Sequence, residues 1–113
     1  MRKQSRVLKE LKRCIEENIN HPLDENYTNI KDINIGDVFV CTEMDEDGGY
    51  NCYFRIVELG DDNELFLLPS DDNGNLLDDL SEIDSDDFTS LNAYVKSNEL
   101  FELVKEWTLM PVK

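Results

Sequence analysis

Apolar and polar residues alternate through the middle of the chain in the way that predicts β-strands. Residues 38–42 (VFVCT) are rich in β-branched and aromatic side chains, which suit a pleated, half-buried surface. Residues 50–59 alternate between two faces, and a third run at 65–68 ends at Pro69, because proline cannot donate to a strand ladder. We therefore expect residues 33–77 to form an antiparallel β core.

The turns between these runs are acidic and contain glycine or asparagine. Residues 45–49 (DEDGG) and 60–63 (GDDN) tolerate positive φ, so each predicts a hairpin. Residues 73–74 (NG) are a further tight-turn signal, after which 76–77 are expected to return as a fourth strand. The Gly-Asp pair at 36–37, directly before VFV, resembles the start of many SH3-like barrels. The core is therefore expected to be a small bent sheet or an open SH3-like barrel.

The cysteines bear on both the core and the compartment. Cys52, Phe54 and Ile56 share one face of the second strand, which we expect in the core. In one register of the first hairpin, Cys41 would lie opposite Cys52. With Cys14 the chain has three cysteines and no C-x-x-C pair, which favours buried free thiols in a reducing, cytoplasmic compartment.

Residues 2–19 have the spacing of an amphipathic helix. Apolar residues recur at intervals of three and four, and the lysines and arginines lie off that stripe. Residues 20–22 (NHP) end the helix, because a residue before proline disfavours the α region. We therefore expect a basic amphipathic helix at 1–20, packed on the sheet. Its apolar stripe consists of Val7, Leu8, Leu11, Ile15 and Ile19.

The last third of the chain is ambiguous. Ser85 or Asp86 would cap a helix at 87–96. The run LFELVKEW at 100–107 fits a helix or a closing strand, which period alone does not separate, and we expect the strand. Residues 78–113 thus supply an acidic segment and a C-terminal helix, strand or both. Together these elements predict a single α+β domain.

Composition favours a folded chain that neither crosses a membrane nor is secreted. Hydrophobic residues make up 40% of the sequence, enough for a packed core. No apolar run approaches the roughly 20 residues that a membrane helix needs. The basic N-terminus lacks the apolar block and cleavage site of a secretory signal.

Charge is distributed unevenly along the chain. The net charge is −15, from 26 acidic and 11 basic residues. Residues 1–13 hold six of the bases and one acid, a net charge of +5. Residues 14–113 hold the other 25 acids and five bases, a net charge of −20. This net charge exceeds the magnitude of roughly 2–8 that is enough to keep a small domain soluble. The excess of negative charge favours a basic partner.

Motifs for catalysis or metal binding do not emerge. The only histidine, His21, precedes a proline in an expected loop, so a nucleophile–base pair has little to build on. None of the five glycines makes a phosphate-loop spacing. An EF-hand loop beginning at Asp71 needs glycine at its sixth position, but Gly74 falls at the fourth. We therefore expect no enzyme activity, no cofactor and no metal site.

Carboxylates gather in and after the predicted turns. Consecutive turns are expected to lie close together, which would concentrate negative charge on a rigid base. If residues 71–87 were helical, their eight acids would span about 26 Å, roughly one per 3 Å, which approaches the charge density of a DNA strand. The alternative is that the charge serves solubility alone. The expected partner-binding residues are Glu43, Asp45, Glu46, Asp47, Glu58, Asp61, Asp62, Glu64, Asp71, Asp72, Asp78, Asp79, Glu82, Asp84, Asp86 and Asp87.

In size and charge the chain resembles phage-encoded anti-defence proteins, including anti-CRISPRs and anti-restriction DNA mimics, and the immunity proteins and antitoxins that block nucleases. The resemblance implies a small acidic inhibitor that occupies the basic nucleic-acid channel of an enzyme and does not itself bind nucleic acid. Tyr50, Tyr53 or Trp107 would then be aromatic anchors within an acidic rim.

Two other functions stay open. A small barrel would bind nucleic acid through its basic N-terminal helix, with Arg2, Lys3, Arg6, Lys9, Lys12 and Arg13 on one exposed patch. A non-enzymatic structural subunit would instead form homo-oligomers, with the basic helix of one copy against the acidic body of another.

Overall fold

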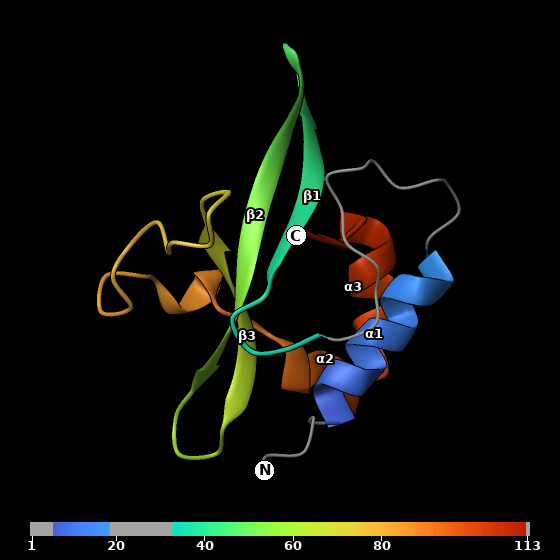
Figure 1. Cartoon of the computed structure of the whole chain (residues 1–113), viewed down its shortest axis with the longest axis vertical. Helices are drawn as coiled ribbons and strands as arrows, with labels where there is room; N and C mark the ends of the chain where they lie inside the picture. Colours follow the sequence, from blue (N-terminus) through green and yellow to red (C-terminus); the bar gives the residue numbers. More distant parts are fainter. Residues whose placement is uncertain (1–5, 19–32, 113) are drawn as a thin grey trace.

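The computed structural model describes residues 6–18 and 33–112, which form an α+β fold of three helices and a five-stranded sheet (Figure 1). The predicted N-terminal helix is confirmed over its described part. The predicted helix end at 20–22, including His21, lies outside the described residues. The elements are α1 (Arg6–Asn18), β1 (Val38–Asp45), β2 (Gly48–Leu59), β3 (Glu64–Ser70), the 3-10 turn η1 (Ser85–Asp87), β4 (Thr89–Ser90), α2 (Leu91–Lys96), α3 (Leu100–Trp107) and β5 (Met110–Pro111).

The sheet is antiparallel and open, with the order β4-β3-β2-β1-β5. The three predicted strands of the antiparallel core are therefore confirmed. The return expected at 76–77 is confirmed only as an isolated antiparallel bridge between Leu76 and Ser70, with Leu77 N donating to Pro69 O at 3.3 Å, and no fourth strand forms there. Thr89–Ser90 pairs with β3 in its place, since it reaches Phe66 and Leu67 after a long acidic connection.

The three helices cover one face of the sheet (Figure 1). The apolar stripe of α1 packs on α3 and α2, so its leucines meet other apolar side chains of the same chain. Alternate residues of the strands face the helices and complete the core, as expected for Ile56 and Cys41. Fully buried side chains include Leu11, Ile15, Phe39, Ile56, Leu67, Leu91 and Val104.

Residues 100–107 form a helix, so the expected closing strand is wrong. A strand would put Phe101, Leu103 and Lys105 on one face, yet Lys105 is exposed. In the helix, Leu100, Leu103 and Val104 are all buried, at the spacing of three and four that faces a neighbouring helix. The helix is favoured because this apolar stripe packs against the apolar face of α1.

α2 begins four residues later than expected and has a different cap. Ser90, not Ser85 or Asp86, is its N-cap, and Ser90 Oγ accepts from Ala93 N at 3.2 Å. The residues before it are committed elsewhere, since 85–87 form η1 and 89–90 pair with β3. The expected end of the helix at residue 96 is confirmed, with Ser97 as the C-cap and Asn98 at a φ of 60°.

Candidate functional site

The first acidic turn is the tip of the β1–β2 hairpin. Glu43, Asp45, Glu46 and Asp47 are all exposed there. Asp45 Oδ1 accepts from Asp47 N at 2.9 Å, so this carboxylate holds the turn in shape. No described lysine or arginine forms an ion pair with the other three carboxylates, and Gly48, at a φ of 124°, completes the two-residue turn.

The second acidic turn joins β2 to β3. Asp61 and Asp62 are exposed at its tip. Glu58 and Glu64 are half-buried, and Glu64 Oε1 accepts from Ser90 Oγ at 2.8 Å. Because Ser90 also caps α2, Glu64 ties the sheet to the helical layer and is not free to bind a partner.

These two turns do not lie together, contrary to expectation. They are at the two ends of β2 and point to opposite ends of the molecule (Figure 1). In an antiparallel meander each strand runs opposite to the one before it, so successive turns lie at opposite ends of the strands. The 12 residues of β2 separate them by about 35 Å or more along the strand. The predicted carboxylates therefore form separate groups and not one patch.

The largest group is the acidic segment, residues 71–87, which lies on the side of the sheet opposite the helices (Figure 1). Asp71 anchors its first turn: Oδ1 accepts from Asn73 N and Asn75 N, both at 2.9 Å. These amide hydrogen bonds, that of Asn75 above all, lower the pKa of Asp71. Asp71 is thus a structural residue of the turn.

Contacts at both ends hold the acidic segment against the sheet. Gly74 is buried, and Arg55 Nη1 of β2 donates to its carbonyl oxygen at 3.4 Å. At the other end Phe88 packs edge-on against Phe66 of β3, with ring centroids 5.6 Å apart. Between these ends the backbone makes turns and η1, not an α-helix. The helical charge spacing considered above is therefore wrong.

The carboxylates of the acidic segment are not neutralised by neighbouring bases. Among the residues that the structure describes, no lysine or arginine forms an ion pair with any of the eight. Leu76 and Ile83 are half-buried, but Leu77 is 62% exposed and Leu80 43% exposed. Two apolar side chains thus lie in water among Asp78, Asp79 and Glu82.

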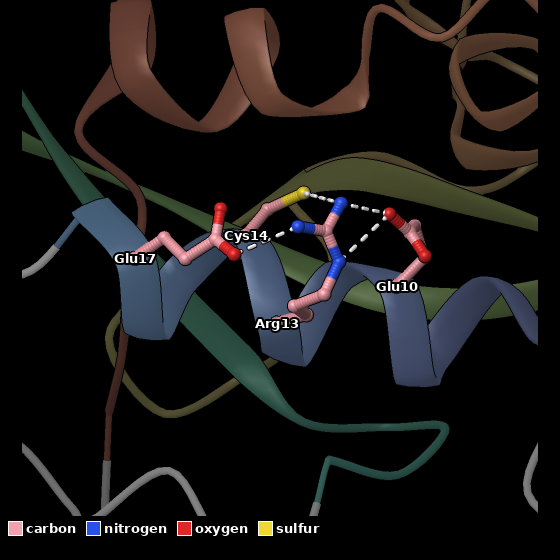
Figure 2. A network of polar contacts seen from close by, with 4 residues as sticks. All are labelled: Glu10, Arg13, Cys14 and Glu17. Carbon is pink, nitrogen blue, oxygen red and sulfur yellow. Dashed lines mark hydrogen bonds and ion pairs between the residues drawn. The ribbon is translucent and has the colours of Figure 1, made fainter.

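The basic helix shows no concentrated positive patch over its described part. Arg6–Asn18 carries four bases and three acids, a net charge of +1. Arg13 lies between Glu10 and Glu17: Nη1 donates to Glu17 Oε1 at 2.8 Å, and Nε to Glu10 Oε1 at 3.1 Å (Figure 2). Two of the predicted nucleic-acid contacts, Arg2 and Lys3, lie outside the described residues.

Three further carboxylates escaped the sequence analysis. Glu99, Glu102 and Glu106 line a groove between α2 and α3, together with Tyr94, Leu103 and Trp107. Their spacing of three and four puts them on one side of a helix, whereas in the expected strand at 100–107 Glu102 and Glu106 would share a face and Glu99 would lie outside the strand. The sequence contains this spacing, but it indicates a shared surface for all three glutamates only once residues 100–107 are known to be helical. Trp107, one of the predicted aromatic anchors, belongs to this groove.

The other two predicted anchors differ in exposure. Tyr50 is 50% exposed near the tip of the first hairpin, whereas Tyr53 is half-buried. Cys41 and Cys52 lie opposite each other in the hairpin register, as one of the registers considered would have it. Both are free thiols, and burial raises the pKa of Cys41 to about 11.

The described ranges contain no group of three or more His, Cys, Asp or Glu side chains placed to hold a metal ion. Of the helices within 6–18 and 33–112, none combines the length and apolar character that a membrane crossing requires. Comparison with known proteins finds no matching family model, curated protein or solved structure.

Proposed function

We propose that this protein is a small acidic inhibitor that binds the basic nucleic-acid channel of an enzyme. Its carboxylates would take the place of phosphates, and the negative field would speed association with the target. The nucleic acid would be displaced by a protein surface of the same sign.

One observation carries the proposal: no described lysine or arginine forms an ion pair with the acidic segment, which is anchored on the sheet. Between Arg55 and Lys96 the sequence holds twelve acids and no lysine or arginine. Keeping so many like charges in one half of a domain costs folding free energy through self-repulsion. Such a cost is understandable if a positively charged partner relieves it.

The exposed leucines support an interface in the same place. Leu77 and Leu80 are surrounded in sequence by Asp78, Asp79 and Glu82. Apolar side chains near the centre of an interface supply affinity, while charges around them supply rate and specificity. An acidic segment that served solubility alone would gain nothing from exposing two leucines.

Binding to a panel of purified restriction, RNA-guided and toxin nucleases, alongside free DNA and RNA, tests the proposal at two salt concentrations. We expect tight binding to one enzyme, competition by that enzyme's nucleic acid, and an association rate that falls about tenfold or more at high salt. Asp78→Asn/Asp79→Asn/Glu82→Gln should slow association, while Leu77→Ala should speed dissociation.

Matched loss of charge elsewhere is the control. Glu43→Gln/Glu46→Gln/Asp47→Asn removes three charges from the first hairpin tip and should affect association less. Binding to free nucleic acid without enzyme preference would refute the proposal and favour the basic-helix alternative. If the protein bound none of the enzymes and neither nucleic acid, the charge would be assigned to solubility alone. The likeness to SH3-like barrels stays a prediction and does not enter this proposal.

A further inference from the structure

A groove between α2 and α3 combines carboxylates with aromatic rings. It has a volume of about 280 Å³, and none of the described residues that line it is a lysine or arginine. Glu102 and Glu106 project from successive turns of α3, and both are exposed. Glu99, just before the helix, is exposed, and its Oε2 lies 3.1 Å from Ser97 Oγ, whose single proton is also within reach of the Ala93 and Tyr94 carbonyl oxygens.

The aromatic rings of the groove are fixed by the core. Trp107 lies against Phe54 of β2, with ring centroids 5.4 Å apart and planes inclined by 34°. Tyr94 also packs against the core and is half-buried. Rings held in this way bind a ligand with little further loss of conformational entropy.

The groove continues to the acidic segment. A second hollow of about 420 Å³ adjoins it and shares Tyr94 and Glu99 with it. This hollow extends past Ser90 to Phe88 and Asp86, where the acidic segment ends. Together the two extend from the α3 carboxylates to Asp86, near the end of the acidic segment.

We propose that this groove binds an arginine-bearing segment of the basic protein partner, an inference that rests on the proposed function. A guanidinium is planar and weakly hydrated, so it stacks on aromatic faces and donates to carboxylates through two N–H groups at once. The Tyr94 and Trp107 rings supply the faces, and Glu99, Glu102 and Glu106 supply the acceptors. The charge of the groove is complementary to that of the partner, and the adjoining hollow reaches Asp86 of the acidic segment.

The chain's single tryptophan makes the groove directly observable. A short blocked peptide with three arginines spaced by Gly-Ser pairs is titrated while Trp107 emission is followed. We expect a saturable change in emission. A peptide with citrulline in place of arginine keeps the shape and loses the charge, and should produce no such change.

Charge-neutral variants locate the binding. Glu102→Gln/Glu106→Gln should weaken peptide binding about tenfold or more, because both close acceptors are lost. Glu43→Gln/Glu46→Gln removes the same charge from the first hairpin tip and should weaken it less than about threefold. All four side chains are exposed, so both variants should keep the wild-type circular dichroism and midpoint of unfolding.

Three results would overturn the inference: unchanged Trp107 emission, equal weakening in both double variants, or equally tight binding of spermidine, which would make this a site for small cations. The outcome is separable from that of the enzyme panel. An enzyme bound without help from Glu102 and Glu106 would keep the proposed function and remove the groove. Peptide binding without any enzyme target would keep the groove as an arginine site and remove the proposed function.

Discussion

Gly74 of the acidic segment lies directly on Val38 of β1: a Cβ atom at Gly74 would come within 2.9 Å of Val38 Cγ2. Gly74 also has a φ of 87°, which other residues adopt only with strain. The acidic segment therefore reaches the sheet at a point where only glycine fits both the contact and the backbone.

Gly74→Ala should lower the free energy of unfolding by about 2–4 kcal/mol, from backbone strain and overpacking together. Gly60→Ala is the matched control, because Gly60 has a φ of 80° with nothing within 4 Å of its added Cβ. It should cost only the backbone part, about 1 kcal/mol. Urea unfolding of the two variants measures the difference, and equal losses would contradict the Val38 contact.

Ser90→Ala should destabilise the domain by about 1–3 kcal/mol. The substitution removes the N-cap of α2 and the hydrogen bond that Ser90 Oγ donates to Glu64. Ser90→Thr keeps a hydroxyl for both roles and should retain most of the stability. Thermal unfolding followed by circular dichroism distinguishes them, and a Thr variant as unstable as the Ala variant would argue against the two hydrogen bonds.

Leu100→Ala should cost about 2–5 kcal/mol, because Leu100 is buried in the interface of α3 with the core. Lys105→Ala should stay within about 0.5 kcal/mol of wild type, since Lys105 is exposed. Denaturant unfolding of both variants tests the helical assignment. The discarded strand would give the opposite order, with position 105 facing inward and position 100 outward.

Stability should fall at alkaline pH through Cys41. Burial raises the pKa of Cys41 from 9.0 to about 11. The unfolded chain therefore loses this proton first, so stability is fully present below about pH 9 and declines towards pH 11, by up to about 2–3 kcal/mol.

Unfolding free energies at the two ends of that pH window measure the effect. Cys41→Ala lowers stability at every pH through its cavity but should show a smaller decline across the window. An identical decline in the variant would assign the pH dependence to other groups, of which Cys14, Tyr50 and Cys52 also have a raised pKa.

The sequence by itself determined α1 and the first three strands. β1, β2 and β3 followed from alternation and from glycine-bearing turns, because each strand's two faces are written in consecutive residues. The stripe from Val7 to Ile15 likewise identified α1 without reference to its neighbours. The excess of acids was legible at once, since it is a sum over the chain.

Tertiary structure decided what these elements meet. Residues 100–107 suited helix or strand until the apolar face of α1 selected the helix and brought Glu99, Glu102 and Glu106 together. The directions of the strands sent the first two acidic turns to opposite ends. A carboxylate is well solvated at any exposed position, so the local sequence does not indicate which carboxylates become neighbours. That is set by the packing of the apolar side chains beneath them.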